Sequence, residues 1–238
     1  MMPAMPVALQ EAATLIVLRP SPRGPPEILL VKRHHRMFFF PHAWVFPGGK
    51  VDAADHHADA VGDVPGLAPE HRVHAIAAIR ECREETGLSL AGEPADLSQL
   101  RVWSWWVTPE VEARRYNTLF FVAAAPTGSE VALQLDELQD RVWITARDAL
   151  ERVAAETDPL HVAPPTFRTL EELAPYATID EVLKAPRRIH PLMPRLDSRE
   201  DGGLDIVLPG DSTYPSDDPV EGPTRIRFGQ GRWWSVRA

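Results

Sequence analysis

Three glutamates crowd one short stretch of this chain. The segment Arg80 to Gly87 reads Arg-Glu-Cys-Arg-Glu-Glu-Thr-Gly, which places Glu81, Glu84 and Glu85 at positions i, i+3 and i+4. On a helix this spacing puts the three carboxylates on one face, where like charges repel one another. A divalent cation would relieve that repulsion, and Mg²⁺ suits oxygen ligands that also meet a phosphate. The spacing therefore favours a site for a divalent cation such as Mg²⁺, although a solvated helix face would carry the same charges.

A helix is expected to position these glutamates. His71 to Thr86 contains neither proline nor glycine, and Gly87 is well placed to end the helix in the left-handed conformation. At about 100° per residue, five less polar side chains fall opposite the glutamates. They are Ala75, Ile76, Ile79, Cys82 and Thr86. One face is thus predicted to pack on the protein, and Cys82, the single cysteine, is expected to be buried there and not to act as a nucleophile.

A glycine-rich segment precedes this helix, and the two together point to a family. The segment reads Trp44-Val-Phe-Pro-Gly-Gly-Lys-Val-Asp52. With the glutamates it resembles the Nudix hydrolase family, whose box reads Gly, five residues, Glu, seven residues and then Arg-Glu-x-x-Glu-Glu-x-Gly. Gly49 matches the opening glycine, and Arg80 to Gly87 match the closing half. The resemblance covers roughly residues 10 to 160 and implies a hydrolase of diphosphate linkages.

The resemblance assigns roles to residues of the helix. It implies that Glu81, Glu84 and Glu85 bind Mg²⁺ or Mn²⁺, with Glu84 and Glu85 as the direct ligands and Glu84 also counted as catalytic. Arg80 is expected to orient a helix carboxylate through charge-assisted hydrogen bonds. The alternative for Arg80 is an ordinary ion pair on the helix surface.

The chain departs from the family's box in one place. Gly49 and Arg80 stand 31 positions apart instead of 14, so about 17 residues are inserted, roughly 53–69. The insert is predicted to be a surface loop, where added residues cost little. Counting eight positions back from Arg80 meets no acid, so Glu70 and Asp52 are the candidates for the box's first glutamate.

The general base is assigned by analogy with the family. Glu137 is the first candidate, because family members often place an acid just before the last strand that contains a tryptophan, here Trp143. Glu110 and Glu112, which follow Thr108-Pro109, are alternatives. The alternative for each of these acids, and the one that the sequence favours, is a solvated loop residue.

The substrate is expected to meet basic residues and the glycine turn. Lys32, Arg33 and Arg36 are candidates for phosphate contacts, while Gly48 and Gly49 let the backbone turn tightly near the metals. Five aromatic residues could stack on a base: Phe38, Phe39, Phe40, Trp105 and Trp106. Aromatic residues on strands are mostly core, so packing is the alternative for them.

The position of the insert narrows the resemblance to one branch. The runs Leu-Leu-Val-Lys-Arg33 and Trp106-Val-Thr-Pro109 fit the branch that contains the peroxisomal coenzyme A diphosphatase. This favours a diphosphatase acting on coenzyme A or acyl-CoA. ADP-ribose, dinucleotides and nucleoside triphosphates stay open as substrates, and so does a nucleotide-sensing module without turnover. All three box glutamates are present, which favours the enzyme.

Composition limits the partners. The net charge of −9 argues against general binding to nucleic acid or anionic membranes. No stretch approaches the roughly 20 apolar residues of a spanning helix, and the N-terminus does not read as a signal peptide. A cytoplasmic enzyme with a small nucleotide-type substrate is expected.

The elements around the helix predict the α/β class, namely an α/β/α sandwich with a mixed sheet, as the resemblance implies. Strands are predicted at 12–18, 27–33, 44–47, 100–107, 116–124 and 141–144, and a helix from Thr145 to about Glu156. Residues 1–160 form the predicted Nudix domain. Residues 161–238, with helices near 166–174 and 178–184 and short strands near 206–208, 224–228 and 232–236, are read as an extension that packs on the domain or on the partner in a homodimer.

Overall fold

The structure is a computed structural model, and it describes residues 7–22, 24–34, 42–134 and 138–236. A mixed eight-stranded sheet forms its centre, with the strand order β10-β7-β8-β1-β2-β3, while β4 pairs with β1 and β9 with β2. Its strands are β1 (Leu9–Ser21), β2 (Gly24–Arg33), β3 (Trp44–Val45), β4 (Gly48–Lys50), β7 (Arg101–Val107), β8 (Arg115–Ala124), β9 (Leu138–Thr145) and β10 (Pro191–Leu192).

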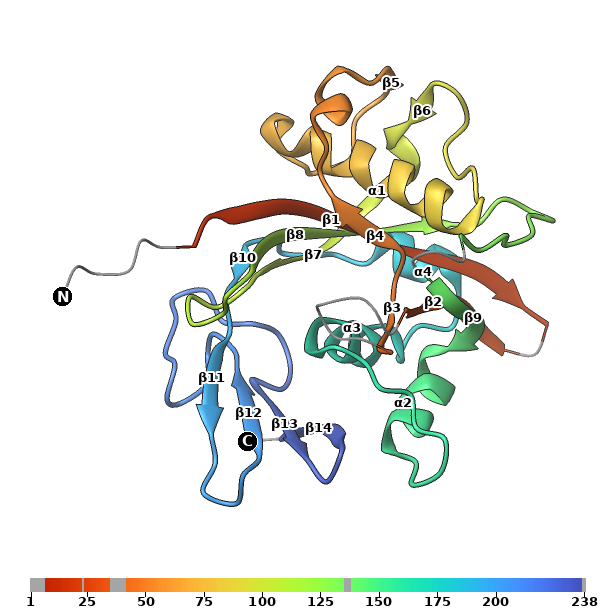
Figure 1. The fold of residues 1–238 in the computed structure, drawn as a ribbon. Helices are drawn as coiled ribbons and strands as arrows, with labels where there is room; N and C mark the ends of the chain where they lie inside the picture. Colours follow the sequence, from red (N-terminus) through yellow and green to blue (C-terminus); the bar gives the residue numbers. More distant parts are fainter. Residues whose placement is uncertain (1–6, 23, 35–41, 135–137, 237–238) are drawn as a thin grey trace.

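Helices cover both faces of this sheet. Helix α1 (Arg72–Thr86) lies on one face, and α2 (Ala146–Ala154) and α3 (Pro164–Leu173) lie on the other, with the short α4 (Ile179–Lys184) after them (Figure 1). The predicted α/β/α sandwich is confirmed. Thr145 caps α2 as expected, since its hydroxyl accepts a hydrogen bond from the Asp148 N–H at 3.2 Å.

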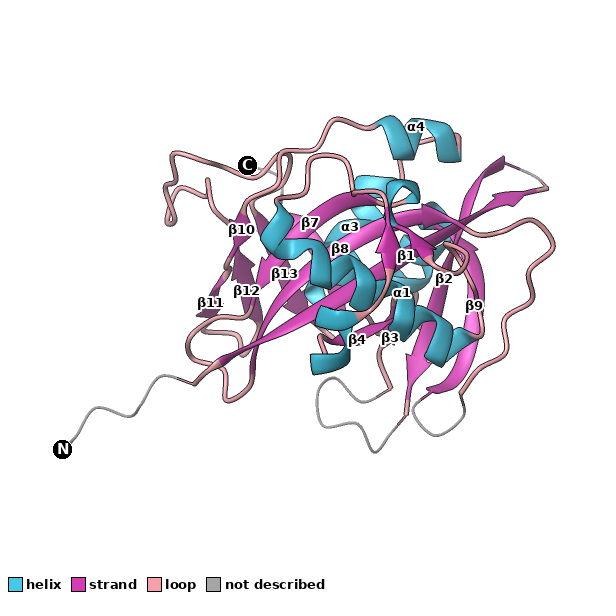
Figure 2. Ribbon diagram, turned by 90° about the horizontal axis from the view of Figure 1, so that it is seen from above, coloured by secondary structure: helices cyan, strands magenta, loops and turns pink. Residues whose placement is uncertain are grey.

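Strand β1 shows why the central strands read as nearly continuous apolar runs. Leu15 and Val17 belong to the core on the α1 side, whereas Ile16 and Leu18 belong to the core on the α2 and α3 side. Alternate side chains point to opposite faces, so a strand covered on both faces needs apolar residues at every position. The view from above shows β1 and β8 running side by side under α1 (Figure 2).

The C-terminal part of the chain joins the same core. Strand β10 extends the main sheet by pairing parallel to β7 at Trp105 and Trp106. A separate antiparallel sheet follows, made of β11 (Arg195–Ser198), β12 (Leu204–Val207), β13 (Arg225–Gly229) and β14 (Arg232–Val236). Ile206, Ile226 and Trp233 of this sheet belong to one core cluster with Ile16 of β1 and Trp44 of β3. Residues before and after position 160 thus share one core cluster, while the division into a domain at 1–160 and an extension at 161–238 stays a prediction.

The insert is more ordered than the predicted surface loop. It contains a 3-10 helix at Ala53–His57 and a two-residue strand β5 (Ala60–Val61), which pairs with β6 (Ala95–Asp96). Asp55 and Val64 are buried. Most of the insert is exposed, as a surface loop would be, whereas the side chains of Asp55 and Val64 pack into the protein.

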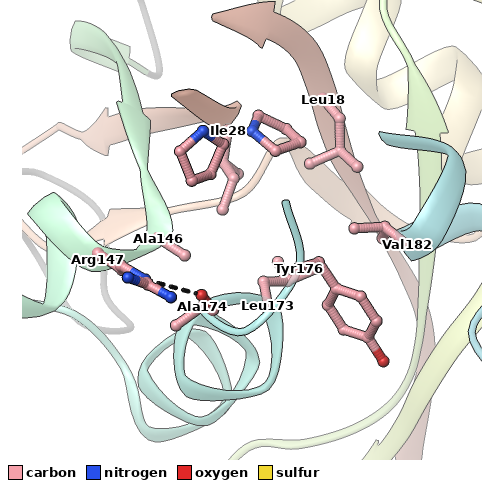
Figure 3. A pocket seen from close by; sticks show the side chains of 10 residues that line it. Leu18, Ile28, Ala146, Arg147, Leu173, Ala174, Tyr176 and Val182 are labelled. Carbon is pink, nitrogen blue, oxygen red and sulfur yellow. Dashed lines mark hydrogen bonds between the residues drawn. The ribbon is translucent and has the colours of Figure 1, made fainter. Parts of the chain in front are cut away.

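A small apolar pocket, lined by none of the three glutamates, lies between the β1–β2 hairpin and the helices α2, α3 and α4. Leu18, Ile28 and Val182 line it, and Arg147 closes one side by donating a hydrogen bond to the carbonyl of Ala174 at 3.1 Å (Figure 3). Its volume of about 10 Å³ is that of a single water molecule. It is a packing gap and carries no site.

Every helix in the described ranges is too short or too polar to span a bilayer.

Candidate active site

Helix α1 has the predicted form and presents the glutamates at different depths. It ends at Gly87, which adopts the left-handed conformation with φ 72°. Glu84 is the most open, with 54% of its side chain exposed, whereas Glu81 is 15% exposed. Glu85 is buried, which differs from the predicted fully acidic outer face. The carboxylates therefore run from the protein interior to solvent along one helical turn.

The opposite face packs as predicted. Ala75 and Cys82 are fully buried against the sheet, and Ile79 is 8% exposed. Burial raises the pKa of the Cys82 thiol to about 12, with the nearby Glu85 charge adding to the effect and a hydrogen bond to Thr86 opposing it. Cys82 is thus a buried small residue held as a neutral thiol.

Strand β4 brings the two glycines directly against the glutamates. The Gly48 N–H donates a hydrogen bond to Glu85 Oε2 at 2.9 Å. A Cβ at Gly49 would stand 2.4 Å from the Glu81 carboxylate, and a Cβ at Gly48 would stand 2.4 Å from the Ala13 carbonyl oxygen. The lack of side chains at these glycines therefore lets β4 lie close to β1 and to α1. The sequence analysis had predicted a tight turn at this position.

Arg80 is the hub that joins this helix to the rest of the site. Its Nε and Nη2 donate to the two oxygens of Asp55 at 2.7 and 2.9 Å, and its Nη1 donates to Glu81 and Glu84, each at 3.0 Å. The hydrogen bonds to Asp55 and the charges of Glu81 and Asp55 raise the pKa of Arg80 further above its ordinary value, against the effect of burial. The guanidinium is permanently charged and bridges two of the three helix carboxylates.

Asp55 was missed by the sequence analysis. It is 1% exposed and lies in the insert, six positions after Gly49, where the family's box has its first glutamate. Counting forward from the glycine would have found it, whereas counting back from Arg80 crosses the insert. The candidates named instead do not fill the role: Glu70 is exposed, and Asp52 is 64% exposed and stands 3.8 Å from Arg80.

Only some of the residues predicted to contact the substrate lie among the described residues. Arg33 ends β2, and its N–H donates to the Ala43 carbonyl at 3.0 Å. Arg36 and Phe38 to Phe40 lie outside the described residues, as does the candidate base Glu137. The alternatives Glu110 and Glu112 lie between β7 and β8.

The two tryptophans behave as packing residues. Trp106 is 6% exposed and belongs to the core on the α2 and α3 side. Trp105 donates from Nε1 to Asn117 Oδ1. The packing alternative is therefore the one that the structure supports for these residues.

The donor set suits a hard cation. Among the described residues, no group of three His, Cys, Asp or Glu side chains has the arrangement of a metal site. The glutamates have other partners here, because Arg80 binds Glu81 and Glu84 and the Gly48 N–H binds Glu85. The space at Gly49 supports a cation site on α1, because it admits the Glu81 carboxylate where any side chain would exclude it. Three carboxylates one helical turn apart are the ligand type that Mg²⁺ and Mn²⁺ take.

Comparison with known proteins finds relatives that align with most of the chain. No protein-family model matches the chain. The acyl-coenzyme A diphosphatase NUDT19 of Gallus gallus is 26% identical over 87% of this chain and 78% of that protein. The human protein of the same name is 25% identical over 84% of this chain and 75% of its own length.

A solved structure agrees with these relatives. The crystal structure of a NUDIX hydrolase from Alicyclobacillus acidocaldarius superposes with a TM-score of 0.68 at 27% identity, covering 75% of this chain and 97% of that one. With the box residues in place on that fold, the chain is similar to Nudix hydrolases in sequence, fold and site residues.

Proposed function

We propose that this enzyme hydrolyses the diphosphate of coenzyme A or of an acyl-CoA with Mg²⁺ or Mn²⁺ bound by Glu81, Glu84 and Glu85. Water attacks one phosphorus, one P–O bond of the bridge breaks, and the products are (acyl-)phosphopantetheine and adenosine 3′,5′-bisphosphate. The relatives that are named acyl-CoA diphosphatases align with most of the chain and support this substrate class. The metal would supply charge neutralisation of the bridge and a more acidic water.

The contact of β4 with α1 is the observation that carries the proposal. Gly48 fixes the Glu85 carboxylate through a backbone N–H, and the missing side chain at Gly49 leaves room for Glu81. Arg80, anchored by the buried Asp55, holds the Glu81 and Glu84 carboxylates on the same side of the helix. These residues hold the three acids on one side of the helix before any ligand arrives.

Arg80 also competes with a metal for the glutamate oxygens. Its Nη1 lies 3.0 Å from both Glu81 and Glu84, so a cation that takes these oxygens must compete with an existing ion pair. Asp55 and the Lys50 carbonyl hold the other side of the guanidinium at 2.7 to 2.9 Å. We infer that Arg80 stays bound to Asp55 when the metal is present and positions the glutamates from the side.

A substrate panel tests the proposal. The enzyme is incubated with Mg²⁺ and, separately, with coenzyme A, ADP-ribose, a diadenosine compound and a nucleoside triphosphate, and products are identified by chromatography and mass spectrometry. The expected result is release of adenosine 3′,5′-bisphosphate from coenzyme A at a rate well above that of the other compounds. Preferential cleavage of another compound would contradict the substrate class. Tight binding of one compound without cleavage of any would favour a nucleotide-sensing module.

A further inference from the structure

A chain of polar side chains lies between the sheet and the N-terminal half of α1. Trp105 of β7 donates from Nε1 to Asn117 of β8, and Asn117 donates from Nδ2 to Glu11 Oε2 of β1 at 2.8 Å. The same Glu11 oxygen lies 2.7 Å from Nε2 of His74 on α1. The neighbouring strands β7, β8 and β1 are therefore joined to the helix of the glutamates by one hydrogen-bond network.

The donors fix the direction of each hydrogen bond in this network. The indole of Trp105 can only donate, so the Asn117 side-chain oxygen accepts and its amide nitrogen donates to Glu11. Because a carboxylate only accepts hydrogen bonds, His74 donates to Glu11 from Nε2–H. A neutral His74 therefore carries its proton on Nε2, and its Nδ1 is an acceptor.

Stability alone does not account for a histidine at this position. His74 is 3% exposed, and its Nδ1 has no hydrogen-bond partner among the described residues. A buried polar atom without a partner costs free energy, which an apolar side chain of similar size avoids. Glu11 does not need the histidine for its own solvation, since 46% of its side chain is exposed.

The helix surface beside His74 has little to fix it against the sheet. Ala75, Ala77 and Ala78 are fully buried between α1 and the sheet. Methyl groups project little from a helix, so they form low ridges that lock poorly into a neighbouring surface. A polar contact of fixed geometry can specify one register where apolar packing alone allows several. The hydrogen bond from His74 to Glu11 is such a contact.

His74 lies on the face of α1 that also carries two of the glutamates. It precedes Glu81 by about two helical turns and Glu85 by about three, so the three side chains point in nearly the same direction. At 1.5 Å per residue, His74 and Glu81 are about 10 Å apart along the helix axis. A rotation of the helix that displaces His74 therefore displaces both glutamates.

The strands connect the two places on the sheet side as well. Glu11 and Ala13 point to the same face of β1, with Cα atoms about 7 Å apart. Ala13 pairs directly with Gly49, which lies against the Glu81 carboxylate. The Val51 N–H donates to the Glu11 carbonyl at 2.9 Å, so β4 stays bound to β1 as far as Glu11. Figure 1 shows α1 lying across β8, β1 and β4.

From these observations we propose that His74 and Glu11 are positioning residues, which fix the rotation of α1 and thereby set where Glu81 and Glu85 stand for cation binding. This inference rests on the proposed function, because it concerns the cation site on α1. The hydrogen bond from His74 to Glu11 holds the N-terminal half of the helix over β1, and the Gly48 N–H holds Glu85 in the C-terminal half. With both halves held, the carboxylates keep one arrangement against β4.

Binding of Mn²⁺ in the absence of substrate tests this role independently of turnover. Electron paramagnetic resonance measures the Mn²⁺ affinity of the wild type and its variants, and Glu84→Gln identifies the ions that bind at the glutamates of α1. We expect His74→Leu to weaken binding of these ions at least about fivefold, while its melting temperature stays within a few degrees of the wild type. Glu11→Ala is expected to share the loss. Glu11→Gln keeps an oxygen that accepts both hydrogen bonds, so it is expected to restore binding.

Val153→Ala is the control for a general loss of stability. Val153 is 2% exposed on α2, in the core on the other face of the sheet, so its truncation destabilises the protein without touching α1. We expect this control to keep the Mn²⁺ affinity of the wild type. An equal loss of affinity in Val153→Ala and His74→Leu, or an unchanged affinity in folded His74→Leu, would overturn the positioning role.

The same experiment separates this inference from the proposed function. If the wild type binds no Mn²⁺ that Glu84→Gln removes, the cation site fails and the positioning role fails with it. If the wild type binds Mn²⁺ but does not cleave coenzyme A, the proposed substrate fails, and the affinities of the His74 and Glu11 variants still decide the positioning role.

Discussion

Asp55 and Asp63 both belong to the insert and both bind an arginine of α1, yet their surroundings are opposite. Asp55 is 1% exposed and binds Arg80 through both oxygens, whereas 93% of the Asp63 side chain is exposed and it binds Arg72 at 2.9 Å. Ion pairs on the surface contribute little, while charged hydrogen bonds to a buried group contribute more. The pair makes a matched comparison within one segment.

We expect Asp55→Asn to lower the free energy of unfolding by about 1.5–3 kcal/mol and to reduce turnover, because Arg80 loses its charged anchor. Asp63→Asn is expected to change the free energy of unfolding by about 0.5 kcal/mol or less and to leave turnover unchanged. Urea denaturation followed by circular dichroism measures the first quantity. Equal losses in the two variants would show that burial of Asp55 does not matter.

Gly48 and Gly49 give a second comparison between neighbours. At Gly49 a methyl group would meet the end of the flexible Glu81 side chain, which can move aside. At Gly48 it would meet the backbone of Ala13 and Thr14, and φ there is +156°. We expect Gly49→Ala to keep the melting temperature within a few degrees but to lose most activity, and Gly48→Ala to lose stability. Thermal melts and turnover of both variants check this, and full activity of Gly49→Ala would contradict the placement of Glu81.

At the scale of elements, the regular parts were predictable from local rules. Helix α1 was expected because residues 71–86 lack proline and glycine, and its C-terminal glycine was expected to end it. The predicted strand at 12–18 lies within β1, and the predicted strand at 27–33 lies within β2. Within the extension, the short strands predicted near 224–228 and 232–236 correspond to β13 and β14.

What local patterns could not show were contacts between distant segments. Strand β4 is two glycines and a lysine, a composition that indicates a turn, and only its pairing with β1 makes it a strand. Likewise β10 is formed by a proline and a leucine that add to the edge of the main sheet at β7. The role of Asp55 needed the insert to fold back onto α1, which spacing counted from Arg80 alone does not reveal.

At the scale of the whole molecule, one core cluster contains residues from both ends of the chain, among them Ile16 of β1 and Trp233 of β14. Trp233 of β14 is 9% exposed, packs on Phe228 and donates a hydrogen bond from Nε1 to the Val162 carbonyl at 2.9 Å. Its neighbour Trp234 is 39% exposed. Because this core is shared, the two parts are expected to unfold in one transition.

We expect Trp233→Ala to lower the free energy of unfolding of the whole protein by about 3–5 kcal/mol, as truncation of a buried tryptophan does. Trp234→Ala is expected to change it by about 1 kcal/mol or less. Denaturation followed in parallel by fluorescence and circular dichroism tests both values. Separate transitions for the extension and the domain would contradict the shared core.

The central claim, that the glutamate face of α1 performs metal-dependent diphosphate cleavage, is tested most directly by the rate of coenzyme A hydrolysis in Glu84→Gln. Glu70→Gln is the matched control, since Glu70 is an exposed glutamate just before the same helix. We predict that Glu84→Gln lowers kcat with saturating Mg²⁺ by at least about 100-fold with an unchanged melting curve, because even residues that only support a metal ligand change activity 10–100-fold. The control is predicted to keep wild-type rates. Undiminished turnover in folded Glu84→Gln would contradict the account.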